Sequence, residues 1–157
     1  MPARYQGSAR ETLALDAFVK LTRASSSLAN RLAPGLAQAG LTESQFGVLE
    51  ALFHIGPLHQ CDLAERILKS SGNMTMVIGN LERRGLVRRQ RSTGDRRFIE
   101  VELTRQGEQI IRKVFPGHAE RLTRLMGVLT EGEQRTLGRL CRKLGLGAGE
   151  LFRMGIV

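Results

Sequence analysis

The spacing of apolar residues changes from helical to alternating after Gly85, and this change constrains the fold more than any other sequence feature. In residues 98–103 every second residue is apolar, which is typical of a half-buried strand. Residues 86–91 are a second strand candidate, and residues 92–95 (Ser-Thr-Gly-Asp) have the composition of a turn. The stretch therefore predicts a β-hairpin. The apolar face of its second strand carries Ile99, Val101 and Leu103.

Three short helices are predicted before the hairpin. Thr42 and Gln45 have the spacing of a capping box, which opens a helix that ends at Gly56-Pro57. A second helix is expected over about 60–68, and Ser70-Ser71-Gly72 is expected to connect and cap a third, which stops before the hairpin. The predicted buried residues are Phe46, Val48, Leu49, Leu52 and Phe53, then Leu63, Ala64 and Ile67, then Met74, Val77, Ile78 and Leu81.

Long helices are predicted toward both ends of the chain. After a loose arm over residues 1–10, apolar residues recur with helical spacing, and Pro34-Gly35 is expected to end or kink this helix. Thr104 is predicted to cap another long helix, which bends at Pro116-Gly117. The sequence does not settle the structure of residues 145–157. A last helix is expected from a second capping box and an apolar stripe, formed by Thr130 and Glu133 and by Leu137, Leu140, Cys141 and Leu144.

Positive charge is concentrated in the predicted hairpin. The chain has a formal net charge of +9, and residues 83–97 hold seven arginines against one acid, Asp95, which gives 7 − 1 = +6. A solvated charged face is the ordinary interpretation of such a run. Here the hairpin and the lack of balancing acids favour contact with a polyanion such as DNA. Arg83 and Arg84 are ambiguous, because they also suit the dipole of the preceding helix.

Two short helices followed by a basic hairpin predict a winged helix-turn-helix. The expected fold is mainly α with a small β-hairpin wing, flanked by N- and C-terminal dimerisation helices. The second helix of such a pair enters the major groove, and wing arginines suit the narrow minor groove. Asp95 is expected to orient an arginine. The predicted DNA-contacting residues are Ser71, Asn73, Thr75, Met76 and Asn80 on the helix and Arg89, Arg91, Asp95, Arg96 and Arg97 in the wing.

The segment from Ser70 to Gly107 closely resembles the multiple-antibiotic-resistance regulator (MarR) family of transcription regulators. The order of elements, with long helices enclosing a central winged helix-turn-helix, resembles that family too. The motifs that carry the resemblance are Asp95-Arg96-Arg97, Val101, Leu103-Thr104 and Gly107, together with Asn80-Leu81-Glu82 and Gly85-Leu86-Val87.

The resemblance covers most of the chain and is strongest over residues 42–112. It implies a single domain over 1–157, with dimerisation helices at about 11–35 and 105–150 and a winged helix-turn-helix at about 42–104. It also implies a homodimer that represses transcription at a pseudo-palindromic operator and releases DNA when a small phenolic or aromatic acid binds. In such proteins the second wing arginine, here Arg97, reaches the minor groove and Asp95 holds it. The sequence identifies no effector-pocket residues.

Other chemistry is weakly indicated. His54, His59, Cys61 and Asp62 are metal-ligand types, but their spacing crosses the Gly56-Pro57 break and no HxxxH pair lies on one helix face, so no metal and no cofactor are expected. Cys61 leaves open a thiol-based redox sensor, and Cys141 suits a core or a dimer interface. A non-specific architectural DNA-binding protein is also open. Without a nucleophile–base pair or a carboxylate cluster we expect no enzyme, and without a signal peptide or membrane-length apolar run we expect a cytoplasmic protein.

Overall fold

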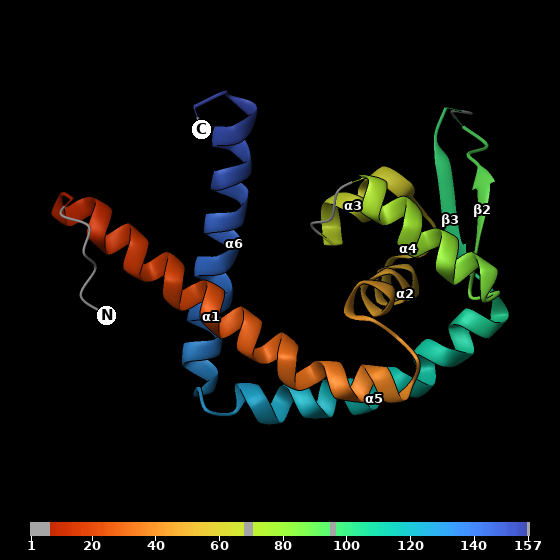
Figure 1. Cartoon of the computed structure of the whole chain (residues 1–157), viewed down its shortest axis with the longest axis horizontal. Coiled ribbons are helices and arrows are strands. Elements are labelled where there is room, and N and C mark those ends of the chain that lie inside the picture. Colours follow the sequence, from red (N-terminus) through yellow and green to blue (C-terminus); the bar gives the residue numbers. More distant parts are fainter. Residues whose placement is uncertain (1–6, 68–70, 95–96, 157) are drawn as a thin grey trace. The chain divides into compact units, whose positions relative to one another are not determined.

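The computed structural model describes residues 7–67, 71–94 and 97–156 (Figure 1). Over these residues the chain is mainly helical with one small antiparallel sheet, so the predicted fold class is confirmed. The chain divides into two compact units, residues 1–119 and 120–157. The single domain expected from the sequence stays a prediction. Among the described residues, no helix is both long enough and apolar enough to cross a membrane.

Helix α1 (Ala9–Gln38) begins earlier than the sequence pattern indicated. The Ser8 side chain accepts a hydrogen bond from the Glu11 N–H, and the Glu11 carboxylate accepts one from the Ser8 N–H. This capping box starts the helix at Ala9, so a loose arm reaching to residue 10 is wrong. The remainder of that arm, residues 1–6, lies outside the described residues.

Helix α1 also does not end at Pro34-Gly35, one of the two outcomes expected there. It continues for another turn and places Leu36, 2% exposed, in the core. Gly40 has a positive φ of 69°, and its N–H bonds to the Ala37 carbonyl while the Leu41 N–H bonds to the Leu36 carbonyl. Burial of Leu36 and this glycine ending stabilise the last turn, although the proline lacks an N–H donor.

The core of the first unit lies among α2 (Glu43–Ile55), α3 (Gln60–Ile67) and α4 (Ser71–Arg83). The capping box of Thr42 and Gln45 is present, and Gly56 ends α2 at a φ of 96°. The predicted connection at Ser70 lies outside the described residues. Most of the predicted core is confirmed, with Phe53, Ile67 and Val77 packed at its edge. The buried residues of these helices are Phe46, Val48, Leu49, Leu52, Leu63, Ala64, Met74, Ile78 and Leu81.

The sheet has the order β1-β3-β2 and contains one strand that the sequence did not reveal. Strands β2 (Val87–Arg91) and β3 (Ile99–Leu103) form the predicted hairpin, with Val87 opposite Leu103. The extra strand, β1 (Leu58–His59), pairs Leu58 with Val101 on the other edge of β3. Two residues are too few to show any alternation, so only their position beside β3 identifies them as a strand. Val101 is fully buried, whereas Ile99, toward the tip, is 42% exposed.

Helix α5 (Arg105–Met126) begins where the hairpin meets the end of α4. As predicted, Thr104 caps it, because its Oγ1 accepts from the Gly107 N–H at 3.1 Å. The same hydroxyl donates to the Gly85 carbonyl at 2.6 Å. A Cβ atom on Gly107 would lie 1.9 Å from the Leu86 carbonyl oxygen, so only glycine fits there. The helix runs through Pro116 to Met126.

The second unit consists mainly of α6 (Glu131–Arg153). The predicted capping box is present, since Thr130 Oγ1 accepts from the Glu133 N–H and the Glu133 carboxylate accepts from the Thr130 N–H. The hydrogen bonds that the carboxylate accepts from the Thr130 N–H and from the Thr130 hydroxyl hold the pKa of Glu133 below its usual value. The glycine-spaced segment that the sequence left undecided continues α6 to Arg153.

Candidate nucleic-acid interface

Helix α4 turns one face into the core and the opposite face to solvent. Met74 and Ile78 are each 0% exposed, as the helical spacing predicted. Asn73 and Thr75 are exposed on the other side, and Met76 is 61% exposed. Three of the helix residues predicted to meet base edges are therefore exposed to solvent.

The two remaining predicted helix residues, Ser71 and Asn80, lie toward opposite ends of α4. Ser71 is the first residue of α4. Asn80 is half-buried in the last turn, and its Oδ1 accepts a hydrogen bond from Arg83 Nη2. Arg84 points elsewhere and donates to the Gly40 carbonyl at 2.8 Å. The two ambiguous arginines thus both have contacts at the C-terminal end of α4, and Arg84 ties that end to the turn after α1.

A contact between α3 and α4 supports the exposed face. Gln60, the first residue of α3, donates from Nε2 to Thr75 Oγ1 at 2.8 Å. Gln60 is half-buried, and its buried Oε1 has no hydrogen-bond partner among the described residues. The bond restricts the rotamer of Thr75 on the solvent-facing side of α4. This pair could not be predicted from local patterns, because the two residues are fifteen positions apart on different helices.

The β2–β3 hairpin, called the wing from here on, stands beside α4 (Figure 1). Arg91 at the end of β2 and Arg97 beyond the turn are both exposed. Arg88 forms an ion pair with Glu102, the residue opposite it on β3. Asp95 and Arg96, predicted to act at the wing tip, lie outside the described residues.

Arg89 connects the wing to α4 through three hydrogen bonds to Glu82. Its Nε and Nη2 donate to Glu82 Oε2 at 3.0 and 2.7 Å, and its backbone N–H donates to Glu82 Oε1 at 3.2 Å. The hydrogen bonds from the Arg89 side chain are the main cause that holds the pKa of Glu82 below its usual value, against a smaller opposing effect of burial. Contact of Arg89 with DNA stays a prediction, and its guanidinium already has a partner within the protein.

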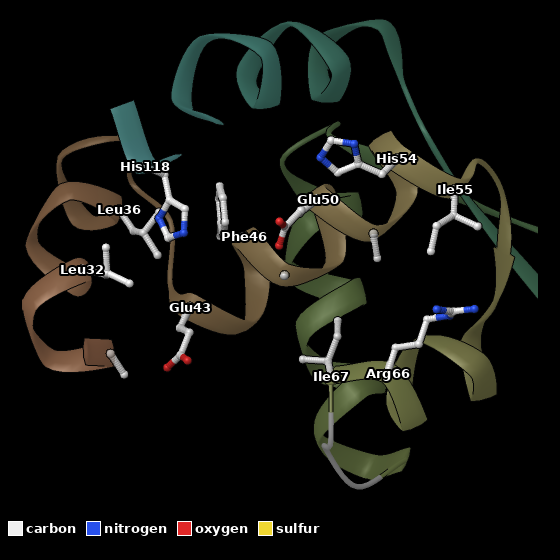
Figure 2. A pocket seen from close by; sticks show the side chains of 13 residues that line it. Leu32, Leu36, Glu43, Phe46, Glu50, His54, Ile55, Arg66, Ile67 and His118 are labelled. Atoms are coloured by element: carbon white, nitrogen blue, oxygen red, sulfur yellow. The ribbon is translucent and has the colours of Figure 1, made fainter. Parts of the chain in front are cut away.

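A pocket of about 490 Å³ opens among α1, α2, α3 and one residue of α5 (Figure 2). Phe46 and His118 lie side by side in its wall, with ring centroids 4.4 Å apart. The pocket combines an apolar lining with a few ionisable groups, which is typical of small-molecule sites. The ionisable side chains are Glu43, Glu50, His54, Arg66 and His118, and the larger apolar ones are Leu32, Leu36, Phe46, Ile55 and Ile67.

The candidate metal-ligand residues do not gather into a site. Within the described part of the chain, no three histidine, cysteine or acidic side chains are grouped so that they could hold a metal ion. Cys61 is exposed, with its Sγ 3.8 Å from Asp62 Oδ1. Cys141 is exposed as well, so a place in the core is wrong for it, and a place in a dimer interface stays a prediction.

Comparison with known proteins agrees with this geometry. The MarR family profile matches residues 41–99, which include α2, α4 and β2. The chain is 33% identical over 136 residues to the HTH-type transcriptional regulator MhqR of Bacillus subtilis, covering 85% of this chain and 92% of that protein.

Two solved structures extend the comparison to the fold. AbsC, a MarR family transcriptional regulator from Streptomyces coelicolor, superposes with a TM-score of 0.79 at 23% identity, over 94% of this chain and 99% of that chain. BpsR from Bordetella bronchiseptica, whose DNA binding is regulated by 6-hydroxynicotinic acid, gives a TM-score of 0.74 at 27% identity, over 83% and 98%. With an exposed helix face beside a basic wing and a relative matched over nine-tenths of its length, the chain belongs to the MarR family of transcription regulators.

Proposed function

We propose that this regulator is a homodimeric, ligand-responsive repressor that binds a pseudo-palindromic operator through α4 and the wing. The observation that carries the proposal is the exposed polar face of α4 beside an arginine-rich hairpin. Short polar side chains can hydrogen-bond base edges, and Met76 can meet a thymine methyl group. The proposed base-contacting residues are Ser71, Asn73, Thr75, Met76 and Asn80.

The wing is proposed to contact the minor groove and the flanking phosphates. Arg97 is exposed next to the tip, which suits insertion into a narrow, negative groove. Arg91, the last residue of β2, is exposed on the other side of the turn from Arg97 and suits a phosphate contact. Asp95 is proposed to orient Arg97, and Arg96 to add to the charge at the tip. Arg89 contributes charge at the base of the wing.

Exposed apolar residues support the homodimer. On α1, Leu13 and Phe18 are 70% and 65% exposed, and on α6, Leu140 and Leu144 are 50% and 57% exposed. A second copy would bury these side chains, and a two-fold axis is the usual arrangement. Two copies of α4 would then contact successive major grooves and recognise an inverted repeat.

Selection of binding sites from random duplexes, followed by a mobility-shift assay, tests the DNA-binding proposal. We expect an inverted-repeat sequence whose affinity falls steeply with salt. Arg97→Ala is expected to weaken binding about tenfold, as for a lost arginine contact in a groove. Arg135→Ala on α6 is the matched control, because its i,i+4 pair with Glu131 is exposed and lies far along the chain from the wing. Equal affinity for every duplex would contradict the proposal and identify an architectural DNA-binding protein.

The pocket in Figure 2 is the proposed effector site. Phe46 and His118 offer aromatic faces, and Arg66 offers a cation for an acidic or phenolic group. The probes are 6-hydroxynicotinic acid and salicylate, and we expect one of them to raise the melting temperature and to release labelled operator. Ala29→Phe on the α1 wall would fill the space and abolish both effects while DNA binding persists. If neither probe shifts the melting temperature, the effector belongs to another chemical class.

The alternatives have less support. Cys61 is exposed, but the comparisons do not favour a thiol-based redox sensor over a ligand-responsive regulator. The similar proteins are transcription regulators, which argues indirectly against an enzyme. Because a regulator acts where the genome is transcribed, we propose a cytoplasmic location.

A further inference from the structure

Glu82 joins the two elements that are proposed to contact DNA. It lies in the last turn of α4, and the three hydrogen bonds that it accepts from Arg89 join it to the middle residue of β2, the wing's first strand. Both side chains are partly buried, with exposed fractions of 37% for Glu82 and 30% for Arg89. One carboxylate therefore binds both the backbone and the guanidinium of the same wing residue.

A second ion pair of the wing, between Arg88 and Glu102, does not have this geometry. Arg88 and Glu102 face each other on β2 and β3, so their pair lies within the hairpin. It stabilises the hairpin itself but does not fix its direction relative to α4. Glu102 thus provides a natural comparison for Glu82, since each is a glutamate paired with an arginine of β2.

Small rotations of the wing about this pair would be amplified at its tip. β2 ends at Arg91 and a strand advances about 3.3 Å per residue, so Gly94, five residues beyond Arg89, lies at most roughly 16 Å farther along the hairpin. A rotation of about 10° about the pair then moves the tip by up to roughly 3 Å, which is the length of a hydrogen bond. Arg97 near the tip can keep one position in a groove only if the base of the wing is held.

A carboxylate at this place is otherwise unfavourable for DNA binding. DNA phosphates repel it, and it neutralises one arginine of the basic cluster. On charge alone, removing Glu82 would tighten binding. The presence of Glu82 is explained if it has a structural role whose benefit exceeds this repulsion.

We propose that Glu82 is a positioning residue for operator binding, which fixes the direction of the wing relative to α4 through Arg89. This inference rests on the proposed contact of the wing with DNA. Glu82 itself is not proposed to touch DNA. Its effect on affinity is exerted through Arg97 at the far end of the hairpin.

The test measures operator affinity by fluorescence anisotropy for full-length wild type, Glu82→Gln, Arg97→Ala and the double variant. Relative to wild type, Glu82→Gln is expected to weaken binding about tenfold, although it makes the protein more positive. In the Arg97→Ala background the same substitution is expected to weaken binding less than twofold, because Glu82 acts through the contact that Arg97 makes. Glu102→Gln, which also removes a carboxylate from the wing, is expected to leave the affinity unchanged or to raise it.

The outcomes separate the two proposals. If Arg97→Ala leaves the affinity unchanged, the proposed wing contact fails, and with it a positioning role for Glu82. Two results would overturn only the positioning role, provided that Arg97→Ala weakens binding. In the first, Glu82→Gln leaves the affinity unchanged or raises it. In the second, the loss of affinity in the double variant equals the product of the two single losses. Arg89→Lys is a second variant that tests the same role if Glu82→Gln does not fold. It keeps the positive charge but cannot donate hydrogen bonds from both Nε and Nη2. It is expected to weaken binding threefold or more, and unchanged affinity would also overturn the role.

Discussion

Gln60 Nε2 donates a 2.8 Å hydrogen bond to Thr75 Oγ1, so the first residue of α3 holds a side chain on the exposed face of α4. Gln60 lies directly after β1, whose pairing with β3 fixes the start of α3. A threonine hydroxyl can accept one hydrogen bond and donate another. The bond from Gln60 therefore uses Thr75 Oγ1 as an acceptor and restricts the rotamer of a residue that is proposed to contact a base.

Gln60→Ala is expected to weaken operator binding about threefold to tenfold, which is the cost of releasing one side chain that reads a base. Sequence preference should broaden at the base pair that Thr75 is proposed to contact. The affinity of wild type and Gln60→Ala for the consensus operator, and for an operator mutated at that base pair, checks this prediction. Gln109→Ala on the exposed side of α5 is the control. A loss of affinity that is equal for both operators would show that Gln60 does not act through base recognition.

Gly107→Ala is expected to destabilise the protein by about 3 kcal/mol or more, because an added Cβ would lie 1.9 Å from the Leu86 carbonyl oxygen and force the backbone apart. Gly138→Ala on α6, where an added Cβ meets nothing within 4 Å, should instead stabilise the helix by about 0.5–1 kcal/mol. Urea unfolding of both variants measures the difference. Similar stabilities for the two variants would contradict the close approach at Gly107.

Local patterns predicted most of the fold. The side chains of Thr42, Thr104 and Thr130 cap helices as expected, and the alternation after Gly85 identified the wing. Such features depend on residues within a few positions of one another. The faces of α4 followed from the same kind of spacing, so its exposed and buried sides could be assigned without a structure.

Contacts between distant segments could not be predicted in the same way. The continuation of α1 past Pro34 depends on the burial of Leu36 against residues of other helices. Arg88, Arg89 and Arg91 look alike in a charge run, yet only the placement of α4 beside β2 decides that Arg89 meets Glu82. The signal for that pair in the sequence was an acid, Glu82, three residues before Gly85.

The stability conferred by Glu82 should depend on pH. Its pKa is lowered in the folded protein, chiefly by the hydrogen bond from Arg89. The contribution is therefore fully present above the unfolded-state pKa of about 4.3 and is lost as the pH falls through the lower folded value. Wild type should be more stable than Glu82→Gln at pH 6, and the difference should shrink by pH 3.5, as urea unfolding can measure. A difference that stays constant over this range would contradict the prediction.

Phe18→Asp is expected to shift the protein from dimer to monomer, because it places a charge among the apolar side chains that α1 exposes. Light scattering after size-exclusion chromatography measures the mass. Operator affinity should fall by at least tenfold, because a monomer binds one half-site. It lacks the affinity that a dimer gains by binding both half-sites at once. Thr22→Asp, an exposed polar position on the same helix, should remain dimeric. If Phe18→Asp stays dimeric and binds normally, α1 does not form the interface, and the exposed leucines of α6 become the remaining candidates for it.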